Sequence, residues 1–219
     1  DVLKAIDLLE QSCKLSNNDF SKWFDLGMAH ARILQWQKAE TCFTASLAVK
    51  ADVDLCYFAR GQIRHRLQRF DDAVEDYSHF LKHNPKHPVV LLHRAISHKA
   101  TGHFELALAD LSQVIAAGDA GPQMLIIRSR IHRSLGNIAA ANADHRAAMK
   151  AVPKTELDWV SLGVAKLHRN PKQSLADFEK ALQLNPKSYG ARLNSAYLLS
   201  EKLDAPEDAI THLDHLISC

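Results

Sequence analysis

The sequence has few of the residues that tight turns and membrane spans require. Its 219 residues include only 8 glycines and 7 prolines, which is little for a β-rich protein with many tight turns. No apolar run reaches the roughly 18 residues that a spanning helix needs, so we expect no membrane partner. An excess of one charge sign is also missing, because 27 basic residues face 25 acidic ones and leave a net charge of +2. That balance argues against a nucleic-acid partner.

Closely spaced cysteines are absent as well. Cys13, Cys42, Cys56 and Cys219 show neither close pairing nor two-residue spacing. Scattered thiols of this kind are more typical of a reducing compartment than of a disulfide framework. The chain starts with Asp1-Val2-Leu3-Lys4, without a charged-then-apolar leader. We therefore expect a cytoplasmic protein.

The short motifs of common catalytic sites do not occur. There is no phosphate-binding or dinucleotide-binding glycine motif, no nucleophile elbow, no H-E-x-x-H and no C-x-x-C. We expect no enzymatic activity and no cofactor. Two histidine pairs, His79 with His83 and His212 with His215, have a spacing that a metal site could use. The further ligands that a metal requires are missing, so we interpret these histidines as surface or packing residues and expect no metal.

Small residues recur with a period of 34 residues. One series contains Gly27, Gly61, Ala95, Ser129, Gly163 and, after a step of 33, Ala196. A second series contains Ala5, Ala39, Ala73, Ala107 and Ala141, and continues with a slip at Ser174 and Ala209. Two independent series with one period indicate an internal structural repeat.

Each period contains two helical patterns. Trp23, Leu26 and His30 share one helix face, and Phe43 and Leu47 share a face of a second helix some twelve residues later. Helix-ending pairs close several periods, namely Asn84-Pro85, Gly121-Pro122, Val152-Pro153 and Asn185-Pro186. The pattern predicts helix–turn–helix hairpins whose small residues let the two helices approach closely.

The run Trp23-x2-Leu26-Gly27-x2-His30, followed by Ala39-x3-Phe43, resembles the signature of the tetratricopeptide repeat family. The resemblance implies an all-α, right-handed superhelical solenoid with about six hairpins after a leading second helix. We predict a single domain over residues 1–219, with repeats near 1–16 (half), 20–53, 54–87, 88–121, 122–155, 156–188 and 189–219. Because the chain starts inside a repeat and ends on a second helix, we expect a fragment of a longer protein.

A charged pattern has the same period. Arginine precedes the small residue of the first helix in repeats two to four, and aspartate occupies one position of the second helix. The sequence therefore predicts the structural ion pairs Arg60–Asp76, Arg94–Asp110 and Arg128–Asp144. Repeat one has Leu26 and Cys42 at these positions, and repeat five has Leu162 with Asp177.

The resemblance also implies that the first helices line a concave groove. The predicted partner-binding residues are an apolar row, Phe24, Phe58, Leu92 and Ile126, and a basic row, Arg32, Arg66, Lys99, Arg130 and Arg133. A peptide or helix with apolar anchors and acidic residues would suit this combination. In the alternative interpretation, the apolar row packs against neighbouring helices and the basic row is a solvated face.

These patterns predict a non-catalytic protein–protein interaction module. The alternatives are a regulatory or sensor segment of a larger signalling enzyme, such as a protein kinase, and a self-assembly module. Some members of the family clamp the C-terminal carboxylate of chaperones with lysine, asparagine and arginine. We do not expect that mode, because only Asn194 comes near the required pattern and it lies at the wrong step.

Overall fold

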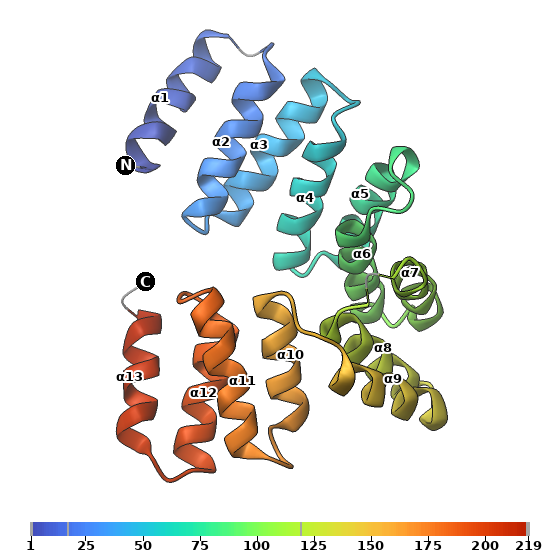
Figure 1. Ribbon diagram of the computed structural model, residues 1–219. Helices are drawn as coiled ribbons and strands as arrows, with labels where there is room; N and C mark the ends of the chain where they lie inside the picture. Colours follow the sequence, from blue (N-terminus) through green and yellow to red (C-terminus); the bar gives the residue numbers. More distant parts are fainter. Residues whose placement is uncertain (1, 17, 119, 218–219) are drawn as a thin grey trace. The chain divides into compact units, whose positions relative to one another are not determined.

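The computed structural model describes residues 2–16, 18–118 and 120–217, and these residues form thirteen α-helices and no strand (Figure 1). Consecutive helices pack as helix–turn–helix pairs, which confirms the predicted all-α fold. The bounds are α1 (Val2–Leu15), α2 (Phe20–Arg32), α3 (Trp36–Val49), α4 (Asp54–Arg66), α5 (Phe70–His83), α6 (Pro88–Ala100), α7 (Phe104–Ala116), α8 (Pro122–Ser134), α9 (Ile138–Lys150), α10 (Glu156–Lys166), α11 (Pro171–Leu184), α12 (Tyr189–Glu201) and α13 (Pro206–Ile217). We number the hairpins from one (α2 and α3) to six (α12 and α13).

Two compact units make up the chain, Asp1–Val114 (the N-terminal unit) and Ile115–Cys219 (the C-terminal unit). Most second helices pack against the first helices that precede and follow them, as α3 packs on α2 and α4 in the N-terminal unit and α11 packs on α10 and α12 in the C-terminal unit. First helices of successive hairpins also touch, as α4 touches α6 and α8 touches α10. None of the helices in the described ranges is long and apolar enough to cross a membrane.

Local sequence explains how each hairpin turns. Hairpins one to four reverse direction through a residue with positive φ at the same repeat position, Leu34, Gln68, Gly102 and Gly136. Several helices also begin at a side-chain cap: Asp19 accepts a hydrogen bond from the Ser21 backbone N–H at the start of α2. The four positive-φ residues therefore set the 34-residue phase in the turns as well as in the helices.

The small residues of the first helices lie against large rings of the second helices. A Cβ at Gly27 would lie 2.8 Å from Phe43 Cε1, and one at Gly61 would lie 2.7 Å from Tyr77 Cε1. Phe43 and Tyr77 are both fully buried. In hairpin three the equivalent positions hold Ala95 and the smaller Leu111. The two helices of a hairpin thus approach closely because the residue facing each ring is small.

The three predicted ion pairs are confirmed. Each arginine binds its aspartate with two nitrogens, and the Nη2–Oδ1 distances are 2.7 Å in Arg60–Asp76, 2.6 Å in Arg94–Asp110 and 2.6 Å in Arg128–Asp144. Hairpin five has Leu162 at the arginine position, and a lysine elsewhere on the first helix pairs with the aspartate. There Lys166, one turn further along the first helix, places Nζ 2.6 Å from Asp177 Oδ2.

The cysteines of the described residues are all free thiols. Cys13, Cys42 and Cys56 are buried and form no disulfide. Cys219 lies outside the described residues.

Candidate protein-interaction surface

The two aromatic members of the predicted apolar row are half-buried on the first helices. Phe24 in α2 packs on the Phe43 ring with a centroid distance of 5.5 Å. Phe58 in α4 packs on Phe80 at 5.9 Å and on His93 of α6 at 5.6 Å. Each residue is only partly buried, so part of its apolar surface stays accessible. Such rings are rigid, partly exposed apolar groups on the surface of the N-terminal unit.

The two aliphatic members of the row are not exposed. Leu92 in α6 is 8% exposed, and Ile126 in α8 is 3% exposed. Ile126 belongs to a cluster with Leu125, Ala148 and Leu162. The interpretation that the row packs against neighbouring helices is therefore correct at these two positions, and the interpretation of Leu92 and Ile126 as accessible anchors is wrong.

Met28 is an accessible apolar residue one turn beyond Phe24, and it is 43% exposed. It lies on the same face of α2 as Phe24, four residues later. The spacing from Phe24 already indicates this in the sequence, because residues four apart lie on one side of a helix. The predicted apolar row contains one residue from each first helix and therefore does not include Met28.

The predicted basic residues gather at the ends of the first helices. Arg32, Arg66 and Lys99 occupy the last turns of α2, α4 and α6 in the N-terminal unit. Arg130 and Arg133 lie in the second half of α8 in the C-terminal unit. Lys99 is half-buried and the other four are exposed. Cations are favoured at helix C-termini, which accounts for their position in the repeat.

These five side chains lack acidic partners within the described part of the chain. Arg60, Arg94 and Arg128, which share one repeat position, each pair with an aspartate. Arg64 and Arg69 pair with Glu40. No carboxylate within 4.0 Å accompanies Arg32, Arg66, Lys99, Arg130 or Arg133 among described residues. Arg66 instead lies over the Trp36 ring at 5.0 Å. The basic row is thus available to an acidic ligand.

A polar cluster joins α4 and α6 next to Phe58. His65 Nδ1 lies 2.8 Å from Ser97 Oγ, and Gln62 Nε2 lies 3.5 Å from His93 Nε2. Burial, with the neighbouring His65 and Arg66 charges, lowers the pKa of His93 to about 4. Burial also lowers the pKa of His65. The rings are therefore neutral near pH 7, and the cluster adds hydrogen-bonding groups to this surface without adding charge.

The histidine pairs whose spacing a metal site could use make other contacts. The His79 ring stacks on Tyr57 at 3.7 Å, and His83 Nδ1 lies 2.8 Å from Asp54 Oδ1. His212 lies at a pocket with Glu179 and Asp208. Within residues 2–16, 18–118 and 120–217, no three His, Cys, Asp or Glu side chains converge as metal ligands would.

Comparisons with known proteins agree with the repeat pattern. The sequence profile of the tetratricopeptide repeat family matches residues 24–88 and 92–154, more than half of the chain. Among curated proteins, none matches the sequence.

Three solved structures illustrate the likeness in fold. A crystal structure of MamA has a TM-score of 0.65 at 13% identity, covering 68% of this chain and 88% of that one. A thermophilic TPR protein of Thermus thermophilus has a TM-score of 0.64 at 18% identity, covering 83% and 99%. The APC/C hetero-tetramer Cut9–Hcn1 has a TM-score of 0.64 at 16% identity, covering all of this chain and 43% of that one. At these identities the likeness concerns the fold alone.

Proposed function

This chain belongs to the tetratricopeptide repeat family, and from that premise we propose that it is a non-catalytic module that binds a peptide or helix of another protein. The binding surface consists of the first helices α2, α4 and α6 of the N-terminal unit. Proteins of this family generally bind other proteins, and one structurally similar chain comes from a protein hetero-tetramer.

The observation that carries the proposal is the unpaired basic row beside accessible apolar groups. Arg32 and Arg66 are exposed and have no carboxylate partner in the described part of the chain, whereas Arg60, Arg64 and Arg69 of the same unit each have one. Met28 and the outer faces of Phe24 and Phe58 supply apolar area on the same helices. A ligand with acidic residues next to apolar ones satisfies both features, since opposite charges orient it and apolar burial holds it.

Selection from a displayed library of random peptides tests this surface without knowledge of the natural partner. We expect enriched peptides to combine acidic with aliphatic or aromatic residues, and their affinity to fall with added salt. Arg32→Glu/Arg66→Glu should weaken the binding of a selected peptide at least tenfold. The matched control Lys82→Glu/Lys86→Glu makes the same change of charge at two exposed lysines, one in the last turn of α5 and one just after it. This control should bind the peptide as the wild type does.

Two results would overturn the proposal. One is that selection enriches no peptide above the starting library. The other is that selected peptides bind the two charge-reversed variants equally, because their affinity would then reflect the overall charge of the chain instead of this surface.

Self-association is a second candidate, favoured by exposed apolar residues at two helices. Leu8 and Leu15 of α1 are 67% and 89% exposed, and Ile210 and Ile217 of α13 are 56% and 85% exposed. Open apolar faces of this kind promote association between chains. Light scattering over a hundredfold range of concentration tests it: a constant monomer mass removes this candidate, and a rising mass that Leu8→Glu/Leu15→Glu abolishes supports it.

A further inference from the structure

The arginine–aspartate pairs fill a recurrent space between three helices. Arg60 of α4 reaches Asp76 of α5 and also donates to Thr44 Oγ1 of α3, the preceding second helix, at 3.3 Å. Arg94 repeats this one hairpin later, because it reaches Ser78 Oγ of α5 at 3.0 Å. In each case the guanidinium occupies the gap between two successive second helices over the first helix between them.

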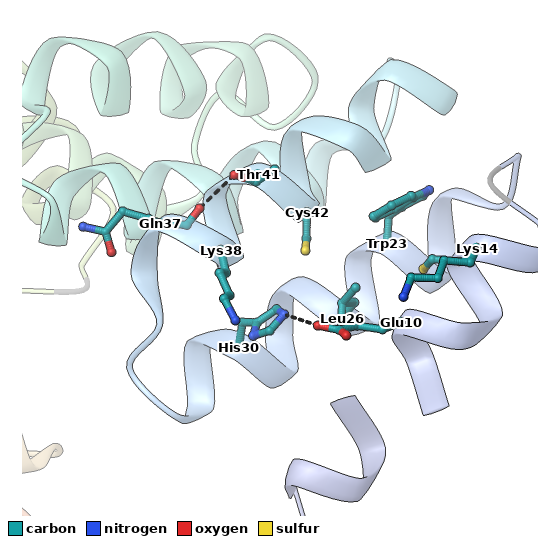
Figure 2. A pocket seen from close by; sticks show the side chains of 10 residues that line it. Glu10, Lys14, Trp23, Leu26, His30, Gln37, Lys38, Thr41 and Cys42 are labelled. Atoms are coloured by element: carbon teal, nitrogen blue, oxygen red, sulfur yellow. Dashed lines mark hydrogen bonds and ion pairs between the residues drawn. The ribbon is translucent and has the colours of Figure 1, made fainter. Parts of the chain in front are cut away.

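Hairpin one has no such pair. Its equivalent residues are Leu26 in place of arginine, Cys42 in place of aspartate, and Glu10 of α1 in place of Thr44. Leu26 and Cys42 are both shorter than the groups they replace, and both are buried. At this place the structure has a pocket of about 380 Å³ between α1, α2 and α3, and these three residues line it (Figure 2).

Hairpin six also lacks the ion pair and also contains a pocket. Its equivalent residues are Ser195 and His212, so the charged pair is again missing. A pocket of about 230 Å³ lies between α11, α12 and α13, and His212 lines it. Hairpins two to five fill the position with Arg60, Arg94, Arg128 or Lys166. Loss of the pair thus accompanies a pocket in both compact units.

We propose that the pocket of hairpin one binds a small molecule with an apolar body and an anionic head group such as a carboxylate. Its volume lies in the range of about 300–1,000 Å³ that small-molecule sites occupy. The pocket of hairpin six falls below that range and carries Glu179 and Asp208, so we assign it no ligand.

The inner wall of the hairpin-one pocket is mostly apolar, and the buried His30 is a polar residue in it. Trp23 and Leu26 of α2 line it, together with the thiols of Cys13 and Cys42, and Figure 2 shows the Cys42 sulfur directed into the space above Leu26. Burial raises the pKa of Cys42 to about 11 and raises that of Cys13. Both thiols are therefore protonated near pH 7, and this wall holds no charge.

Charged groups are confined to the edge of this pocket. Lys14 of α1 and Lys38 of α3 lie there, and neither has a carboxylate partner within the described ranges. The single acidic residue, Glu10, lies 3.8 Å from His30 Nε2, whose ring also bonds Gln35 through Nδ1 at 2.8 Å. Two free amines against one partnered carboxylate favour an anionic head group over a cationic one.

Fluorescence of 1-anilinonaphthalene-8-sulfonate, which has an apolar body and an anionic head, measures binding directly. We expect saturable one-to-one binding to the whole chain and displacement by decanoate, with weaker displacement by decanol. Leu26→Arg/Cys42→Asp installs the pair of hairpins two to four and should weaken the binding of the dye at least tenfold. The matched control Ser195→Arg/His212→Asp installs the same pair in hairpin six and should leave that binding unchanged.

A second measurement does not depend on the folding of a variant. Decanoate should slow the reaction of Cys13 and Cys42 with N-ethylmaleimide in the wild-type chain at least fivefold, and should not alter the reaction of Cys56, which lies outside the pocket. The proposal is overturned if all three thiols respond alike, if the dye does not saturate, or if the Leu26→Arg/Cys42→Asp variant is folded and binds as the wild type does. If decanol displaces the dye as strongly as decanoate does, the assignment of an anionic head group is wrong.

Discussion

Replacement of Gly27 by alanine tests how the hairpins are held together. In the middle of a helix this change alone favours folding by about 1 kcal/mol, because glycine is the more flexible residue. Here the new Cβ would lie 2.8 and 2.9 Å from two ring carbons of the fully buried Phe43. Overpacking of this kind costs about 1–3 kcal/mol. We therefore expect Gly27→Ala to lower the free energy of unfolding by about 1 kcal/mol.

A double-mutant cycle with Phe43→Leu separates these two effects. Hairpin three has alanine and leucine at the equivalent positions, Ala95 and Leu111, so Gly27→Ala/Phe43→Leu reproduces a combination that the fold already contains. The clash disappears in the double variant, and the coupling energy from urea unfolding should be about 1–2 kcal/mol. A stabilising Gly27→Ala, or a coupling energy near zero, would refute the packing argument.

Three further predictions concern single buried groups. Asp76→Asn should cost about 3–5 kcal/mol in urea unfolding, because the buried Asp76 is the carboxylate that Arg60 binds, while Arg64 keeps only Glu40; Asp72→Asn at a partly exposed pair should cost at most about 1 kcal/mol. The pKa of His93 lies near 4 in the fold and near 6.5 in the unfolded chain, so the unfolded chain binds more protons between these pH values. Stability should therefore fall by about 3 kcal/mol from this residue as the pH drops from 7 to 4, and pH-dependent unfolding of His93→Gln should lack that part of the loss. The Tyr77 hydroxyl is buried without a hydrogen-bond partner among the described residues. Tyr77→Phe should therefore raise the free energy of unfolding by about 1 kcal/mol and, with it, the thermal midpoint. A lowered midpoint would contradict this.

Much of the fold was predictable because small residues mark where helices meet. Gly27 and Gly61 keep one phase since each faces a large ring, and this constraint repeats whenever the same hairpin repeats. The ion pair Arg60–Asp76 was predictable for the same reason, because both residues recur in register in the next two hairpins. Periodic positions thus carry information that a single repeat would not.

Features that depend on differences between hairpins were harder to predict. Phe58 and Leu92 share a repeat position, but the larger ring keeps one face accessible while the shorter side chain is covered. Lys166 replaces the missing arginine of hairpin five from one turn away, at the repeat position from which Arg64 also reaches Asp76, whereas the predicted pairs used the Arg60 position alone. The pocket at Leu26 and Cys42 arises because shorter side chains leave space, and the amount of space follows from how the neighbouring helices pack.

Hydroxyl-radical footprinting with a selected acidic peptide tests the proposed binding surface most directly. Met28 and Met149 are similarly exposed, 43% and 36%, but Met28 lies on the first helix α2 and Met149 on the second helix α9. Mass spectrometry of the labelled chain reports the oxidation of each methionine with and without the peptide. We predict that the bound peptide protects Met28 and leaves Met149 unchanged. Protection of Met149 with Met28 unaffected would contradict binding by the first helices of the N-terminal unit.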